Sequence, residues 1–153
     1  MYQRILVPFD GSATSTCGLD EAIKLAALTG ASLRILHLVD DLLYATGFET
    51  YAAYVNDVIP LMREVGERIL QDGRLRAEKA GVPVETQLVE GFATRLADVV
   101  ADQADAWHAD LIVIGTHGRR GVSRLVLGSD AEHVMRTAPV PVLLVRSKGS
   151  IAA

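Results

Sequence analysis

Three glycines and a serine at fixed spacing are the residues of this sequence best suited to hold a phosphate group. Gly115 is followed after two residues by Gly118, and after nine more by Gly128 and Ser129. Glycine has no side chain to keep an anion away from the backbone, and the free N–H groups of a helix N-terminus point toward such an anion. An apolar run at 111–114 precedes the first glycine, and a helical pattern begins at Ser129. This order of strand, loop and helix indicates a phosphate-binding site.

Two common phosphate-binding motifs are absent from the sequence. There is no GxxxxGK[ST] segment, so the lysine and the magnesium-binding hydroxyl of a P-loop are missing. The spacing of Gly115, Gly118 and Gly121 does not fit the dinucleotide pattern GxGxxG, and no Cys or His residues have metal-ligand spacing. The loop therefore favours holding phosphates over cleaving them. The structural alternative is that its glycines only shape a turn.

The residues after the third glycine admit more than one role. Ser129 with Glu132 fits a capping box, in which the serine side chain bonds a helix N–H and the glutamate bonds back. A helix capped in this way still offers further N–H donors to a phosphate. Asp130 suits the positive end of the helix dipole, but it would repel a phosphate if its side chain faced the site.

Cationic and imidazole side chains near the motif add further candidates. Arginines at 119, 120 and 124 could meet phosphates or remain solvated. His117 could neighbour a phosphate, but no carboxylate adjacent in the sequence would make it a catalyst. His37 lies inside an apolar run and is expected to be a core or strand-end residue.

Asp10 is the carboxylate most suited to recognise a sugar or a base. It follows the apolar run at 5–9 and precedes Gly11 and Ser12, a composition that also fits a plain turn before a helix. A carboxylate at a strand end accepts hydrogen bonds from a ribose hydroxyl or an adenine amino group. If the strands that end at Asp10 and at Ile114 are neighbours, Asp10 and the glycine loop share one crevice, and the ligand is a nucleotide.

The rest of the sequence alternates strand patterns with helix patterns. Strands are predicted at 5–9, 33–39, 84–89, 111–114 and 140–145. Helical stripes are predicted at 19–27, 62–69, 96–107 and 129–137, with a long, partly helical connection at 40–54. Pro60 is expected either to begin the second helix or to kink it. The alternation predicts an α/β fold with a parallel sheet covered on both faces, which binds ligands where the strand order reverses.

The composition excludes several classes of protein. The chain has 153 residues, half of them hydrophobic, which fits one domain and excludes a disordered chain. The net charge of −4 without a long basic run argues against a nucleic-acid partner, and no apolar run approaches the about 20 residues of a membrane span. Cys17 is the single cysteine, so no intrachain disulfide forms, which fits the cytoplasm. We expect one domain at 1–147 and a loose tail at 148–153.

These segments together resemble the universal stress protein family over about residues 2–146. The similarity rests on the segments 4–12, 109–118, 128–129, 132–134 and 138–146. The glycines 115, 118 and 128 with Ser129 fill every fixed position of G-x2-G-x9-G-[S/T], the pattern of the family's ATP-binding members.

The resemblance implies a Rossmann-like fold of the adenine nucleotide alpha hydrolase type, with an open five-stranded parallel sheet in the order 3-2-1-4-5. It implies that Asp10 with Pro8 and Phe9 holds the nucleoside and that Val39 packs against adenine. The implied nucleotide-binding residues are Pro8, Phe9, Asp10, Val39, Ile114, Gly115, His117, Gly118, Arg119, Gly128, Ser129, Asp130 and Ala131. Asp130 departs from the small or apolar residue common at its position, and Ala131 lacks a hydroxyl that some binders supply.

The expected function is that of a cytoplasmic stress protein that binds ATP or AMP, with or without Mg²⁺, and signals through its bound state. ADP or a cyclic nucleotide is an alternative ligand. A slow ATP hydrolase or phosphotransferase is one alternative, although the sequence offers no clear general base or phosphate-neutralising lysine. A nucleotide-free dimeric interaction module is the other. A homodimer through the edge strand at 140–145 is expected because an exposed apolar edge invites pairing. No membrane partner is expected, and a protein partner stays unidentified.

Overall fold

The computed structural model describes residues 1–40, 51–91, 93–116 and 127–147. Its strands are β1 (Arg4–Pro8), β2 (Ser32–Asp40), β3 (Val84–Gly91), β4 (Leu111–Gly115) and β5 (Val142–Val145). Its helices are α1 (Ala13–Thr29), α2 (Tyr51–Ala53), the π-helix η2 (Tyr54–Val58), α3 (Ile59–Lys79), α4 (Leu96–Trp107) and α5 (Ser129–Thr137).

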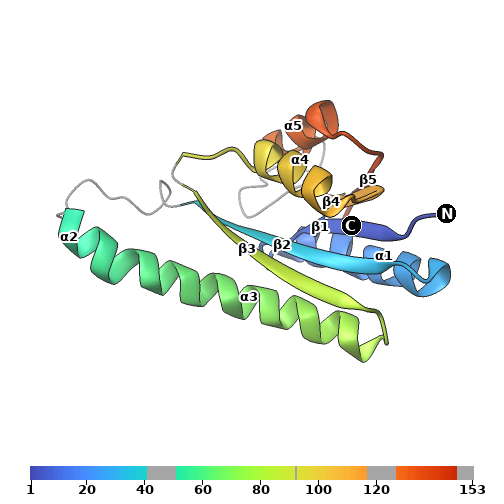
Figure 1. Ribbon diagram of the computed structural model, residues 1–153, viewed down its shortest axis with the longest axis horizontal. Coiled ribbons are helices and arrows are strands. Elements are labelled where there is room, and N and C mark those ends of the chain that lie inside the picture. Colours follow the sequence, from blue (N-terminus) through green and yellow to red (C-terminus); the bar gives the residue numbers. More distant parts are fainter. Residues whose placement is uncertain (41–50, 92, 117–126, 148–153) are drawn as a thin grey trace, which may run out of the picture.

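The five strands form one parallel sheet in the order β3-β2-β1-β4-β5, which confirms the predicted fold class and strand order. Alternate residues of each strand enter two separate cores. Ile5 and Val7 join one core under α1 and α3, whereas Leu6 and Ile112 join the other under α4 and α5. Figure 1 shows α3 along one side of the sheet and the α4–α5 pair on the other.

The central strand β1 pairs over a shorter length with β4 than with β2. β1 pairs with β2 along its whole length, from Arg4 to Pro8, but it pairs with β4 only through Ile5 with Leu111 and Leu6 with Ile112. Beyond Leu6 and Ile112 the carboxyl ends of β1 and β4 therefore run without a shared ladder. This is the reversal of strand order at which a parallel sheet opens a ligand crevice.

Helix α3 approaches the sheet closely because two of its buried positions are glycines. A Cβ at Gly73 would lie 3.1 Å from Cδ1 of Ile35 and 3.2 Å from Cε1 of Phe9. A Cβ at Gly66 would lie 2.8 Å from Cδ1 of Leu88. A side chain at either position would meet these atoms, so either the neighbouring side chains or α3 would have to shift.

Several predicted boundaries need correction. β5 begins at Val142 rather than at 140, because proline at 139 and at 141 has no N–H to donate to the ladder. The strand predicted at 84–89 continues to Gly91. Pro60 lies in the first turn of α3, directly after the π-helical turn. The part of the 40–54 connection at 41–50 lies outside the described residues, as does the tail at 148–153.

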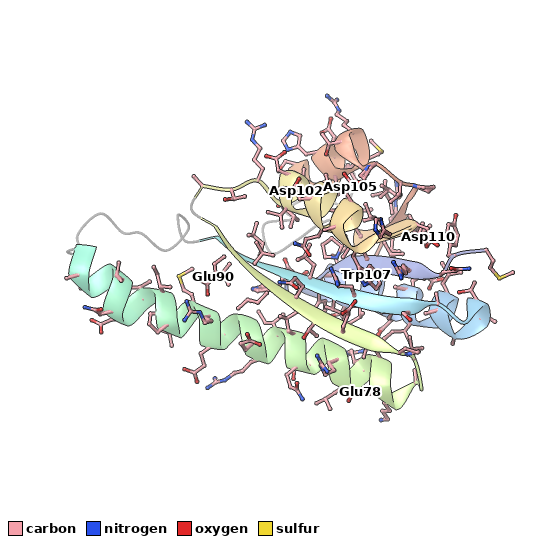
Figure 2. All side chains as sticks on the ribbon, viewed as in Figure 1. Glu78, Glu90, Asp102, Asp105, Trp107 and Asp110 are labelled. Carbon is pink, nitrogen blue, oxygen red and sulfur yellow. The ribbon has the colours of Figure 1, made fainter. Side chains whose placement is uncertain are left out.

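A carboxylate fixes the amino end of β1 to β4. The two side-chain oxygens of Asp110 accept the backbone N–H groups of Gln3 at 2.8 Å and Arg4 at 3.0 Å. The Arg4 guanidinium donates to the carbonyl of Trp107 at 3.0 Å. Figure 2 shows Asp110 and Trp107 at this end of the sheet. The two strands are thus held together at the end opposite to the crevice.

An ion pair joins α3 to the carboxyl end of β3. The guanidinium of Arg63 donates to both carboxylate oxygens of Glu90, with the Nη2–Oε2 contact at 3.0 Å. Glu90 lies between β3 and α3 in Figure 2. The hydrogen bond from Arg63 lowers the pKa of the Glu90 carboxyl, burial opposes this shift, and the charge of Arg63 adds to it.

We predict that Glu90→Gln reduces the acid sensitivity of folding. A carboxyl whose pKa is lower in the folded state stabilises the fold at neutral pH, and this contribution is lost as the pH falls from the ordinary value of 4.5 through the folded pKa. The variant should be less stable than wild type at pH 7, and the two should converge in acid. Urea unfolding across this pH range measures the effect. Glu78→Gln, at the other end of α3, is the control, and parallel pH profiles for wild type and Glu90→Gln would contradict the prediction.

Candidate functional site

The candidate site is the region at the carboxyl ends of β1 and β4, where the strand order reverses and a ligand crevice is expected. Pro8, Phe9 and Ile114 are buried beside it, and Asp10 is half-exposed in the turn that follows β1. The α1 helix that begins after this turn contacts Gly115 at the end of β4. The structure therefore brings Asp10 and the first motif glycine to the same edge of the sheet, as the strand order requires.

Asp10 is held in a turn that also caps α1. Its Oδ1 accepts the Ser12 N–H at 2.9 Å, and its own N–H lies 3.4 Å from Oγ of Ser15. Ser12 is the N-cap of α1, and its hydroxyl accepts the Ser15 N–H at 3.2 Å. Gly11 takes the left-handed conformation that the turn needs, with φ of 79°. Asp10 therefore has the turn role that its sequence allowed, and this role fixes where its carboxylate lies.

Gly115 is required by the packing of α1. A Cβ at this position would lie 2.6 Å from the carbonyl oxygen of Thr14, which real Cβ contacts do not permit. On the helix side, a Cβ at Gly18 would lie 3.1 Å from the backbone nitrogen of Gly115. Two facing glycines thus let the first turns of α1 rest directly on the backbone of β4. Gly115 therefore has a structural role in helix packing, whether or not it also contacts a phosphate.

One backbone hydrogen bond joins the two ends of the glycine motif. The Gly128 N–H donates to the carbonyl of Thr116 at 2.8 Å, and the Thr116 N–H donates to the carbonyl of Val145 at 3.0 Å. The N-terminus of α5 is therefore fixed beside the end of β4, although eleven residues separate Thr116 from Gly128. The predicted site residues His117, Gly118 and Arg119, like the arginines at 120 and 124, lie outside the described residues.

The predicted capping box at Ser129 is wrong. Gly128 is the N-cap of α5, and Ser129 is the first helical residue with its side chain exposed. Glu132 does not bond back but accepts from Arg136 one turn later, at 2.7 Å. The extended backbone of Gly128, tied to Thr116, takes the position that the serine would need as a cap.

Because α5 begins at Ser129, backbone N–H groups at its start are available as donors. The first bond of the helix runs from the Glu132 N–H to the carbonyl of Gly128 at 3.0 Å. The N–H groups at 129–131 therefore have no acceptor within the helix itself. Asp130 is exposed in the first turn, whereas the side chain of Ala131 is 2% exposed and packs in the core under α5. Ala131 can reach a ligand through its backbone only.

The two large side chains predicted to contact the nucleoside enter the core. The ring of Phe9 packs beneath Gly73 of α3, and Val39, at the carboxyl end of β2, packs beneath Gly66. Phe9 therefore offers the crevice its backbone rather than its ring. The predicted contact of Val39 with adenine stays a prediction.

His37 is a residue whose place near the site was missed from the sequence. Its Nδ1 lies 2.8 Å from the carbonyl oxygen of Phe9, the residue before Asp10. The sequence placed it in the core or at a strand end because a histidine between two leucines carries no spacing signal. The contact depends on the β1–β2 register, which pairs Pro8 with Leu36.

A hollow lies between α1 and α3. It has a volume of about 550 Å³ and is lined by Phe9, Gly11, Thr16, Ile69, Asp72, Leu75, Arg76 and Lys79. Of the motif glycines that the structure describes, neither Gly115 nor Gly128 borders it. In the described part of the chain, no three His, Cys, Asp or Glu residues could together hold a metal ion, and no helix has the length and apolar character to cross a membrane.

The sequence and the fold have close counterparts among known proteins. The model of the universal stress protein family matches residues 1–146. The chain belongs to this family. A universal stress protein of Methanocaldococcus jannaschii is 33% identical over an alignment of 161 positions, which covers 95% of this chain and 83% of the relative.

Solved universal stress proteins share the architecture. A family member from Burkholderia pseudomallei is 33% identical, with a TM-score of 0.74 over 94% of this chain and 96% of its own. A universal stress protein whose crystal structure is a complex with cAMP is 29% identical, with a TM-score of 0.69 over 95% of this chain and 98% of its own.

We predict that Gly115→Ala costs this universal stress protein about 1–3 kcal/mol of unfolding free energy, because the new Cβ overlaps a backbone carbonyl that cannot rotate away. Gly18→Ala, on the other side of the same contact, is the matched control. It should cost less, because its clash is milder and alanine favours the helix by about 1 kcal/mol. Urea denaturation measures both. A Gly115→Ala variant as stable as Gly18→Ala would contradict the packing argument.

Proposed function

We propose that this universal stress protein binds an adenine nucleotide in the crevice between β1 and β4, and that the bound state carries its role in a stress response. The observation that carries the proposal is the hydrogen bond from Gly128 to Thr116. It places a helix N-terminus beside the end of β4, while Asp10 lies in the turn after β1. The relative that was crystallised with cAMP supports an adenine nucleotide as the ligand class.

The phosphate end of the ligand would lie at α5. The helix dipole and the N–H groups at 129–131 favour an anion there. Gly118, Arg119 and His117 would complete this side, as the complete glycine motif implies. Ser129, with its exposed hydroxyl, is a further donor.

The nucleoside end would lie at Asp10. One oxygen of its carboxylate accepts the Ser12 N–H, so the side chain is oriented before any ligand arrives. A pre-oriented carboxylate accepts a ribose hydroxyl or an adenine amino group without the entropy cost of ordering a free side chain. Together the two ends favour a nucleotide over a free phosphate.

The proposed role is binding rather than turnover, because the motif has no lysine to neutralise phosphate charge. Mg²⁺, where it accompanies ATP, would be held mainly by the phosphates. A homodimer through the 140–145 segment and a cytoplasmic location stay predictions. Leu143, which is 38% exposed on the last strand of the sheet, is consistent with pairing there.

We predict micromolar binding of AMP or ATP by isothermal titration, with Asp10→Asn about tenfold or more weaker for AMP. Asparagine keeps an oxygen for the Ser12 N–H, so the turn survives. It loses the charge of an acceptor whose hydrogen bonds contribute about 1.5–3 kcal/mol each, compared with about 0.5–1.5 kcal/mol for a neutral acceptor. Asp102→Asn, an exposed carboxylate on α4, is the control. A wild-type protein that binds no adenine nucleotide would favour the nucleotide-free interaction module, and an Asp10→Asn variant with wild-type affinity would remove Asp10 from the site.

We predict that Asp130→Asn strengthens ATP binding more than AMP binding. Asp130 is exposed in the first turn of α5, and its repulsion grows with the number of phosphate charges beside it. A screened surface charge of this kind changes the ratio of the two dissociation constants by about two- to fivefold. Titrations at low salt measure the ratio, with Asp102→Asn again as the control. A ratio equal to that of wild type would show that Asp130 faces away from the phosphates.

A further inference from the structure

We propose that His37 is a positioning residue for nucleotide binding: its imidazole holds the Phe9 carbonyl and so fixes the peptide that presents Asp10 to the crevice. The inference rests on the proposed function and adds to it a residue that does not itself touch the ligand. His37 lies on β2, one strand away from the crevice between β1 and β4.

The geometry begins where the β1–β2 ladder ends. The last paired residues are Pro8 and Leu36, and the Phe9 N–H still donates to the carbonyl of Leu36 at 2.8 Å. The Phe9 carbonyl points back to β2, and Nδ1 of His37 lies 2.8 Å from it. A carbonyl oxygen can only accept, so Nδ1 carries the proton and donates. Both polar groups of Phe9 are therefore held by β2.

That carbonyl belongs to the peptide that joins Phe9 to Asp10. A peptide is planar, so holding its oxygen also sets the direction of the Asp10 N–H and the starting direction of the Asp10 backbone. Downstream, the Asp10 carboxylate is held by the Ser12 N–H at 2.9 Å. Asp10 is thus restrained on both sides, by His37 before it and by the cap of α1 after it.

Helix α3 holds the imidazole in place. A Cβ at Gly66 would lie 2.9 Å from Cδ2 of His37 and 3.3 Å from Cγ2 of Val39. The absent side chain of Gly66 is the space in which the edge of the ring lies. A ring confined between a strand and a helix backbone has few rotamers, so its hydrogen bond to Phe9 costs little further entropy.

The test compares two substitutions at His37. His37→Asn keeps an N–H donor near the place of Nδ1, whereas His37→Leu has similar bulk and no donor. Leu33→Val, at the amino end of the same strand, is a stability control that removes buried volume from the same core and leaves the imidazole of His37 unchanged. AMP affinity is measured by titration for each variant, alone and combined with Asp10→Asn.

We expect His37→Leu to weaken AMP binding about tenfold, and His37→Asn and Leu33→Val to stay within about threefold of wild type. In the Asp10→Asn background the effect of His37→Leu should fall to about twofold or less, because the histidine acts through Asp10. The proposal would be overturned if His37→Leu weakened AMP binding equally in the wild-type and Asp10→Asn backgrounds. An equal loss of AMP affinity in Leu33→Val would also overturn it, because a purely structural role of His37 gives either result.

Hydrogen exchange separates failure of this proposal from failure of nucleotide binding. Slow exchange of the Ser12 N–H reports the Asp10 turn without any ligand. We expect its protection to fall in His37→Leu and to survive in His37→Asn and Leu33→Val. If wild type binds no AMP but the Ser12 N–H loses protection only in His37→Leu, the proposed nucleotide binding is wrong. His37 then still positions the Asp10 turn. If protection is the same in all variants, His37 does not position Asp10.

Discussion

The early separation of β1 from β4 is the constraint on which the rest of the structure depends. The two strands share only two paired positions, because the connection after β1 leads to β2 and the connection after β4 leads to β5. Right-handed crossovers then place α1 and α5 on opposite faces of the sheet. The chain therefore continues from the two strand ends toward opposite faces of the sheet.

Where the strands of the sheet end, backbone groups lose the ladder partners that they would have had, and the structure replaces several of those bonds locally. The Phe9 carbonyl accepts from His37, and the Asp10 N–H lies near the Ser15 hydroxyl. On the other strand, the Thr116 carbonyl accepts from Gly128. Each replacement also fixes the backbone at or next to a residue of the candidate site, so the contacts that complete the strand ends also set the geometry of that site.

The sequence predicted the layers and the strand order because these depend on periodicity and on a family resemblance that spans the chain. It failed where a contact depends on the register of distant segments. The capping box at Ser129 matched a local pattern, but the hydrogen bond of Gly128 to Thr116 moved the cap by one residue. Likewise, nothing local to His37 indicates that its ring bonds the backbone of another strand. The role of Asp10 as a turn residue was readable, because Asp-Gly-Ser before a helix is a local signal.

The two buried glycines of α3 have a consequence for how this protein can change over time. Gly66 faces His37 and Val39, and Gly73 faces Phe9, so each lies directly behind a residue at the end of β1 or β2. Neither glycine is among the nucleotide-binding residues that the family resemblance implies. A side chain at either position would meet those residues from the α3 side of the sheet. The residues that these two positions of α3 can accept are therefore limited by the geometry of the strand ends beneath them.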